Sequence, residues 1–190
     1  MKRMNIVCLG DSFSKGFGVT EEENWISLLN EVADIKFINK GINGDTTGGM
    51  LSRFYRDVVS ENPKCVMIEG GFNDFLAECN RGVVQANMMA LVHQAYHHKI
   101  MPLIIISPQG KTNEFVGNWP EFIPIEQVQE QFAAYRGWIK RFCKGFSIPY
   151  IDLNEQIHPF TYIDGIHINA EGHKYVAQHV KAFIDVNFVL

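Results

Sequence analysis

The sequence lacks the features of nucleic-acid-binding and membrane-spanning proteins. Its 17 Lys and Arg residues are fewer than its 21 Asp and Glu residues, which leaves a net charge of −4 and an isoelectric point near 6.0. Without a basic surplus, nucleic acid is not an expected partner. No stretch approaches the roughly 18 consecutive apolar residues of a membrane span, and the apolar segment near the N-terminus is too short for a secretory signal. We therefore expect a cytoplasmic protein that is not inserted in a membrane.

Cysteine is scarce, and its spacing does not suggest a redox or metal motif. There are four cysteines, none of them in a CxxC pair: Cys8, Cys65, Cys79 and Cys143. Two of them fall in predicted strands, where a buried, reduced thiol is the simpler interpretation. No cluster of histidines and cysteines converges on a predicted loop, so we expect neither a metal ion nor another cofactor.

The segment after the first predicted strand lacks the nucleotide-binding motifs. A phosphate loop ends in glycine then lysine, whereas Lys15 and Gly16 stand here in the reverse order, and the Rossmann glycine pattern is absent. A response-regulator receiver domain would place paired acids after the first strand and an aspartate at the end of the third. Only Asp11 follows the first strand, and Glu69 ends the third.

The composition is that of an ordinary globular domain. Apolar residues make up 46% of the 190 residues and charged residues 20%, which is enough for one domain over residues 1–190 with a sizeable core. Most predicted strands are continuous apolar runs, as in a parallel sheet covered on both faces. The expected strands are residues 5–9, 35–39, 65–69, 103–107 and 150–153.

Helical patterns alternate with these strands. A capping box from Thr20 to Glu23 opens the first helix, and Asn169 is the expected N-cap of the last. Repeated strand–helix units predict right-handed crossovers and a three-layer α/β/α sandwich. The expected helices are residues 20–32, 47–59, 82–98, 125–146 and 170–188.

One long irregular stretch, residues 108–124, interrupts this alternation. It carries Phe115, Trp119 and Phe122, and loops of this length in compact domains are usually functional. Its aromatic side chains could line an acyl or aryl pocket, form a platform for a sugar ring, or simply pack on the domain as a hydrophobic lid.

Chemically capable residues follow four of the strands. Ser12 follows the first strand, Gly44 the second, Asn73 the third, and Asp164 with His167 the fifth. Because ligands bind at the carboxyl ends of parallel strands, these residues are expected at one edge of the sheet.

Their residue types suit acyl transfer. Ser12 would attack a carbonyl carbon, His167 would take its proton, and Asp164 would orient the imidazole. The backbone N–H groups of Ser12 and Gly44 and the amide of Asn73 are candidate oxyanion donors.

The neighbouring polar residues have simpler interpretations. Asp11 is expected to hold the turn or the helix that follows it, and Asp74 either braces the Asn73 loop or is a surface turn residue. His158 is the main rival for the base, but no acid lies at short spacing from it. The other histidines are expected on helices, at an exposed end, facing solvent or packed on a flank: His93, His97, His98, His173 and His179.

Taken together, Gly10-Asp11-Ser12, Gly44, the segment 71–74 and the segment 164–167 resemble the four sequence blocks of the SGNH hydrolases, also called GDSL esterases/lipases. The resemblance covers nearly the whole chain, and the length is similar to that of the small bacterial thioesterase/lysophospholipase members. It implies a five-stranded parallel sheet in the order 2-1-3-4-5. Phe13 replaces the leucine of the family motif, an apolar exchange at the pocket floor.

The resemblance also assigns roles and a reaction. Ser12 would be the nucleophile, Gly44 and Asn73 oxyanion donors, His167 the base and Asp164 the third triad member. The implied activity is hydrolysis of a carboxylic ester or thioester through an acyl-enzyme, with a small-molecule substrate and no cofactor. Two alternatives stay open: a carbohydrate O-acetylesterase of the same family, and a non-catalytic binding module that retains the pocket.

Overall fold

A parallel sheet forms the middle layer of the protein. The computed structural model describes residues 4–111, 124–154 and 162–187. The strands are β1 (Met4–Gly10), β2 (Ile35–Gly41), β3 (Cys65–Ile68), β4 (Met101–Ile106) and β5 (Tyr150–Asp152), in the order β2-β1-β3-β4-β5. All neighbouring pairs are parallel. Both the strand positions and the predicted order 2-1-3-4-5 are confirmed.

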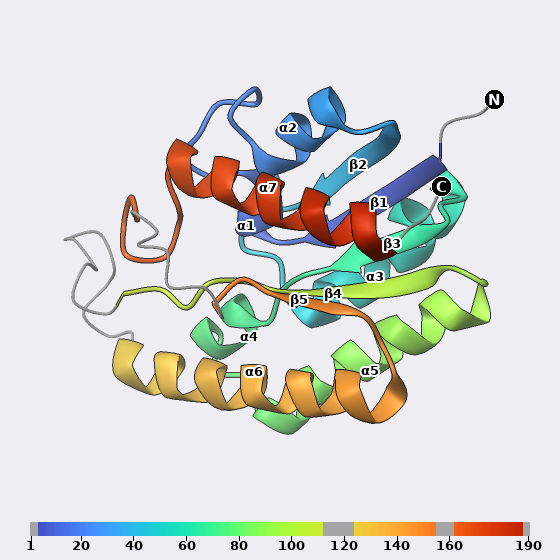
Figure 1. Cartoon of the computed structure of the whole chain (residues 1–190). Coiled ribbons are helices and arrows are strands. Elements are labelled where there is room, and N and C mark those ends of the chain that lie inside the picture. The colour runs from blue at the N-terminus through green and yellow to red at the C-terminus, as the bar shows by residue number, and fades with distance from the viewer. Residues whose placement is uncertain (1–3, 112–123, 155–161, 188–190) are drawn as a thin grey trace.

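Helices cover both faces of the sheet (Figure 1). One face packs on α3 (Thr47–Asp57), α5 (Arg81–His97) and α6 (Ile125–Phe146), and the other on α2 (Trp25–Val32) and α7 (Ala170–Asn187). Successive residues of β1 point to opposite faces, so Val7 joins one core cluster and Cys8 the other. Because both faces are covered, the strands read as continuous apolar runs.

The expected first helix begins later than predicted. Thr20 N–H does donate to Glu23 Oε2 at 3.0 Å, as in a capping box, but residues 21–24 form a turn. The helix α2 begins at Trp25, because the Asn24 side chain accepts the N–H of Ile26 and acts as the N-cap.

Three short helical segments were not predicted. They are α1 (Ser12–Lys15), the 3₁₀ turn η1 (Val59–Glu61) and α4 (Phe72–Leu76). Segments of three to five residues are too short to show a helical period in the sequence. Two of them, α1 and α4, begin shortly after β1 and β3 end, and so start at the carboxyl edge of the sheet.

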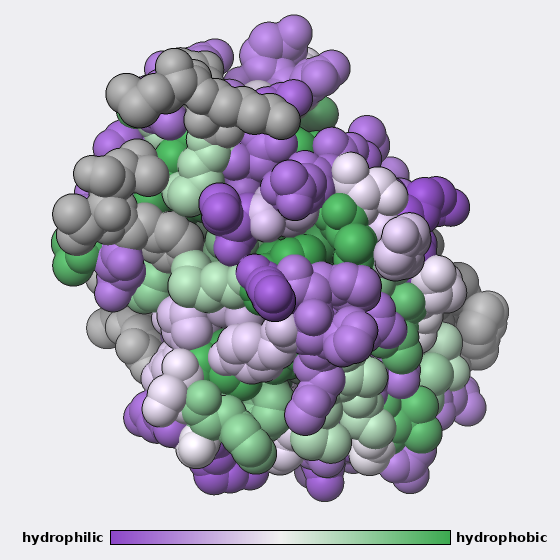
Figure 2. Space-filling view, turned by 90° about the vertical axis from the view of Figure 1, so that its right-hand side faces the viewer, coloured by the Kyte–Doolittle hydropathy of each residue, from purple (hydrophilic) through white to green (hydrophobic). Residues whose placement is uncertain are grey.

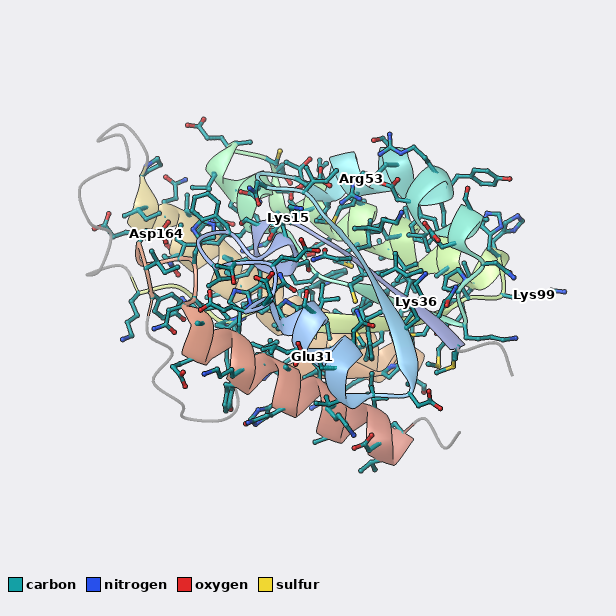
Figure 3. All side chains as sticks on the ribbon, turned by 90° about the horizontal axis from the view of Figure 1, so that it is seen from above. Lys15, Glu31, Lys36, Arg53, Lys99 and Asp164 are labelled. Carbon is teal, nitrogen blue, oxygen red and sulfur yellow. The ribbon has the colours of Figure 1, made fainter. Side chains whose placement is uncertain are left out.

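The carboxyl ends of the strands and the beginnings of the strands lie at opposite ends of the molecule. The turns after β1 and β3, with α1 and α4, lie on the left of Figure 1. Seen from above, Asp164 lies at this end of the molecule, and Lys99, in the turn before β4, lies at the other (Figure 3). Figure 2 views the end where the strands begin, on which apolar residues lie in separate patches between polar ones. The candidate site residues therefore belong to the carboxyl end.

Candidate active site

Ser12 is fixed at a sharp turn between β1 and α1. Asp11 is the N-cap of α1, and its Oδ1 accepts the N–H of Phe13 at 2.9 Å. This confirms the expectation that Asp11 holds the turn and the helix after it. Ser12 is thus the first residue of a helical turn whose direction the Asp11 carboxylate sets.

The loop that carries Asp164 and His167 reaches back to Ser12. Asp164 Oδ1 accepts the N–H groups of Ile166 (3.0 Å) and His167 (2.8 Å), which closes the loop around the carboxylate. Asp164 Oδ2 lies 2.6 Å from His167 Nδ1, and His167 Nε2 lies 2.9 Å from Ser12 Oγ. One continuous hydrogen-bonded chain therefore runs from carboxylate through imidazole to hydroxyl.

The charge state of Asp164 suits this arrangement. Burial by itself raises the pKa of Asp164, but the hydrogen bonds from the backbone and ring of His167 and from the N–H of Ile166 outweigh it, and the pKa lies below its usual value. The carboxylate is therefore ionised at neutral pH and accepts a proton-bearing Nδ1, which leaves Nε2 free to accept the proton of Ser12.

An aromatic ring that the sequence did not single out packs on the imidazole. The centroids of the Phe17 and His167 rings are 4.4 Å apart and their planes are inclined by 40°. Phe17 is 45% exposed and contacts the imidazole ring, whereas Ser12 Oγ lies at the Nε2 edge of the same ring.

Asn73 lies in α4, beside Ser12. Two glycines after β3, Gly70 and Gly71, have φ values of 151° and 114°, and the left-handed region at Gly71 explains why a glycine precedes this helix. Asn73 Nδ2 donates to Asp11 Oδ2 at 3.1 Å and to the carbonyl of Asp45 at 3.0 Å. Both amide hydrogens of Asn73 therefore have acceptors within the protein.

Gly44 lies in the loop after β2. Its φ of 74° is in the left-handed region, whereas a Cβ at this position would meet nothing within 4 Å. The backbone angle therefore accounts for a glycine at this position. The N–H groups of Gly44 and Ser12 make no hydrogen bond to other described residues, so both stay available as donors.

A cavity of about 50 Å³ opens beside the nucleophile candidate. Ser12, Asn73 and His167 line it, whereas Gly44 and Asp164 are not among the described lining residues. Its other polar groups come from Asp11, Glu69, Ser107 and His173, and its apolar wall comes mainly from Phe13, Phe17, Phe72, Leu76, Phe132, Ile166 and Ile168.

Beneath Ser12 lies a cluster of charged side chains, which we call the buried polar layer: Asp11, Asp45, Arg53, Glu69 and Asp74. Arg53 pairs with Asp45 at 2.7 Å and donates to the Gly10 carbonyl at 3.1 Å. These contacts tie the Gly44 loop to the end of β1. Apart from the turn roles expected for Asp11 and Asp74, sequence reasoning missed this layer, because its partners are far apart along the chain.

Asp74 is a brace and not a surface turn residue. It is 2% exposed, and its carboxylate accepts the backbone N–H of Thr47 (2.9 Å) and the Thr47 hydroxyl (2.6 Å). These bonds join α4, which carries Asn73, to the N-terminus of α3.

The other histidines do not reach the site as bases. His173, expected on the solvent side or the flank of the last helix, is buried: its Nδ1 accepts the N–H of Trp25 at 3.3 Å. Burial, with the nearby His167, lowers the pKa of His173 to about 4, so it is neutral and structural. His93 and His97 are exposed on α5. His158, like Phe115, Trp119 and Phe122 of the long irregular stretch, lies outside the described residues.

The described residues hold no group of three or more His, Cys, Asp or Glu side chains that could bind a metal ion. No helix in this part of the chain is long and apolar enough to cross a bilayer.

Comparison with known proteins identifies the family. A sequence model of the GDSL-like lipase/acylhydrolase family matches residues 8–175. An arylesterase from Vibrio mimicus is 33% identical over 135 residues, which cover 65% of this chain and 68% of that protein. Esterase TesA from Pseudomonas aeruginosa is 32% identical over 95 residues, about half of each chain (47%).

Solved structures share the fold. A lipolytic protein of the G-D-S-L family from Desulfitobacterium hafniense matches with a TM-score of 0.79 and 23% identity, covering 95% of this chain and 99% of that one. A lipase/acylhydrolase from Enterococcus faecalis matches with a TM-score of 0.80 and 21% identity, covering 96% of each chain. The family match spans the strands and loops that carry the Ser12, Asn73 and His167 contacts. The chain therefore belongs to the GDSL-like lipase/acylhydrolase family and is a serine hydrolase that acts on ester bonds.

Proposed function

We propose that Ser12 is the nucleophile, His167 the general base and Asp164 the residue that orients the base. The hydrogen-bonded chain from Asp164 Oδ2 through His167 to Ser12 Oγ, with contacts of 2.6 and 2.9 Å, carries this proposal. Nucleophile and base are already within hydrogen-bond distance, which is the geometry that activates a serine hydroxyl.

The reaction then takes two steps. Ser12 Oγ bonds to the carbonyl carbon while its proton moves to His167 Nε2, and the imidazolium returns this proton to the departing alcohol or thiol. Water next attacks the acyl-enzyme and gives a proton to His167 Nε2, and the acid leaves as Ser12 regains its proton. Asp164 stays ionised throughout and stabilises the imidazolium.

The oxyanion formed in each step needs donors. We assign this role to the N–H groups of Ser12 and Gly44 and to the amide of Asn73. The amide already donates to Asp11 and to Asp45 O, so one of these bonds must be shared with the oxyanion or broken. A preorganised donor of this kind contributes about 2.7–4 kcal/mol to transition-state stabilisation.

The size of the cavity favours a short acyl group. The centres of water molecules have about 50 Å³ of space in the cavity. At roughly 10–15 Å³ for one water on this measure, this is room for only a few waters, which suits acetyl or propionyl better than a fatty acyl chain. The exposed apolar side chains Phe17 and Ile163, each 45% exposed, offer a surface to an apolar or aromatic alcohol. Similarity to an arylesterase supports the same class.

The first experiment is a p-nitrophenyl ester series: acetate, butyrate, octanoate and palmitate. Wild type should prefer acetate, and Ser12→Ala and His167→Ala should lose turnover while keeping the fold by circular dichroism. Ser52→Ala, on the exposed side of α3, is the matched serine control and should behave as wild type.

Turnover that persists in Ser12→Ala would contradict the mechanism. A preference for octanoate or palmitate would contradict the short-acyl proposal and leave the mechanism intact. O-acetylated carbohydrates and aryl acetates carry the same acetyl group, so the cavity volume does not favour one over the other, and acetylated xylose and phenyl acetate should be compared by kcat/KM. No turnover of any ester would favour the binding-module alternative.

Two expectations from the sequence stay predictions: a single domain over residues 1–190 and a cytoplasmic location.

A further inference from the structure

Glu69 is a buried acid for which the two-step mechanism has no use. It follows β3 directly, is 3% exposed, and its N–H donates to Leu9 O at 3.0 Å, which fixes its backbone beside β1. Ser14 Oγ donates to Glu69 Oε2 at 3.2 Å, and the N–H of Asp11 points to the same oxygen at 3.4 Å. Glu69 also lines the cavity beside Ser12.

The side chains of Glu69 and Asp11 are hydrogen-bonded to each other. Two carboxyl groups can form such a bond only if one of them carries a proton. Asp11 uses its two oxygens as acceptors, Oδ1 for Phe13 N–H and Oδ2 for the amide of Asn73. Glu69 accepts hydrogen bonds as well, from Ser14 Oγ, from Ser107 and from the N–H of Asp11. Because burial and the charge of Asp11 disfavour the ionised form of Glu69, we place the shared proton on Glu69, which donates it to Asp11.

The electrostatic surroundings agree with a protonated Glu69. Burial, and then the charge of Asp11, hold the pKa of Glu69 well above its usual range, and burial raises the pKa of Asp11 to about 6. The only cation of the buried polar layer, Arg53, is paired with Asp45 and Asp57. The other titratable groups that face the pair are Asp45, Asp74, Tyr135, His167 and His173.

We propose that Glu69 is a positioning residue of the esterase site, which keeps a proton and donates it to Asp11. Through this bond it holds Asp11 as the acceptor that fixes both the turn of Ser12 and the amide of Asn73. The proposal rests on the proposed function, because holding the Asn73 amide in place matters for catalysis only if that amide donates to the oxyanion.

The proton also limits the charge beneath the reaction centre. With Glu69 neutral, the pair carries one negative charge above the pKa of Asp11. Loss of the proton at alkaline pH breaks the bond to Asp11 and places a second negative charge near the developing oxyanion, and repulsion between like charges is strong in a buried site. We expect kcat to fall at alkaline pH, with little change in KM.

The variants Glu69→Gln and Glu69→Leu distinguish the effect of the hydrogen bond donated to Asp11 from the effect of the ionisable charge. A glutamine amide can donate to Asp11 and accept from Ser14, but it cannot ionise. Glu69→Gln should keep kcat within about threefold of wild type at neutral pH and lose the alkaline decline. Glu69→Leu fills the space without a donor, and its kcat should fall about tenfold or more, less than the 10²–10³-fold expected for losing an oxyanion donor itself. Glu171→Gln, on the exposed surface of α7, is the matched control.

An infrared measurement tests the protonation of Glu69 without an activity assay. Wild type at neutral pH should show the carbonyl band of a neutral carboxylic acid that Glu69→Gln lacks, and the result does not depend on Glu69→Leu folding. Three outcomes would overturn the proposal: unchanged kcat in folded Glu69→Leu, a Glu69→Gln variant as slow as Glu69→Leu, or the same alkaline decline in Glu69→Gln as in wild type. Turnover that persists in Ser12→Ala would instead overturn the proposed function.

Discussion

The loop of residues 162–168 and the buried polar layer both present carboxylates to the site, but they control the charge of these groups in opposite ways. In the loop, hydrogen bonds from His167 and Ile166 lower the pKa of Asp164, whose side chain is 24% exposed. In the layer, burial dominates and raises the pKa of Asp11 and Glu69.

These two kinds of surroundings explain how one site can hold both an ionised and a protonated acid at neutral pH. Where backbone donors surround a carboxylate, the charged form is stabilised, and where apolar strands surround it, the neutral form is stabilised. We infer that the loop supplies the chemistry and that the layer supplies the framework. Changes in the loop should therefore reduce turnover, and changes in the layer should reduce stability as well.

The largest effect on turnover is expected from Asp164→Asn. The side chain keeps its shape but no longer favours a proton on His167 Nδ1, so the imidazole takes the wrong tautomer to act as a base. We expect kcat to fall about 10⁴-fold, with little loss in the free energy of unfolding. Asp185→Asn, on the exposed side of α7, is the control. A loss below tenfold would contradict the role of Asp164.

Arg53→Leu should remove the central ion pairs of the buried polar layer and lower the free energy of unfolding. It leaves the largely buried carboxylate of Asp45 without its cation and Asp57 with Arg56 alone, and removing one partner of a buried ion pair typically destabilises by about 3–5 kcal/mol. Urea unfolding measures this, with Arg141→Leu, on the exposed side of α6, as the control. Equal stability of the two variants would show that the layer is not the framework that we infer.

Asn73→Ala should affect both regions, because its amide bridges the layer and the reaction centre. We expect kcat to fall by about 10²–10³ with KM nearly unchanged. Steady-state kinetics with p-nitrophenyl acetate measure the two constants. If only KM rises, Asn73 binds substrate and is not an oxyanion donor.

The smallest effect concerns acid stability. The pKa of His173 is 6.5 in its unperturbed state and about 4 in the folded protein. Between these values the unfolded chain binds more protons than the folded chain, so stability falls as the pH falls from about 6.5 to 4, by at most about 3 kcal/mol. In His173→Asn, whose amide oxygen can still accept Trp25 N–H, this acid-induced loss should shrink. Parallel curves of unfolding free energy against pH would contradict the assignment.

The strands and the loops that carry the candidate site residues could be predicted because their signals are local. Apolar runs mark β1 and β3, and Ser12 and Asn73 follow within five residues of the end of a strand. The start of α2 could not be placed, because both Thr20 and Asn24 are residues that can cap a helix. Asn24 is the cap in the structure: its side chain accepts the N–H of Ile26 and also donates to Ser14 O, a residue ten positions earlier.

The buried polar layer could not be predicted for a different reason. Ser14 and Glu69 are 55 residues apart in the chain, and Arg53 and Gly10 are 43 apart. Each residue has an ordinary interpretation by itself, as a helix residue or a strand end, and only the meeting of β1, β3 and α3 makes it part of one cluster. The sequence therefore indicated the candidate reacting groups and the turn roles of Asp11 and Asp74, but not the cluster that joins these acids to Glu69 and Arg53.

The most direct test of the proposed mechanism is to trap the acyl-enzyme on Ser12. Wild type is mixed with p-nitrophenyl acetate, quenched in acid within milliseconds, digested and analysed by mass spectrometry. The proposed mechanism predicts one acetyl group on the peptide that contains Ser12, formed at the rate of the p-nitrophenol burst and missing in Ser12→Ala. Turnover with no acetyl group on Ser12, or with the acetyl group on another residue, would contradict it.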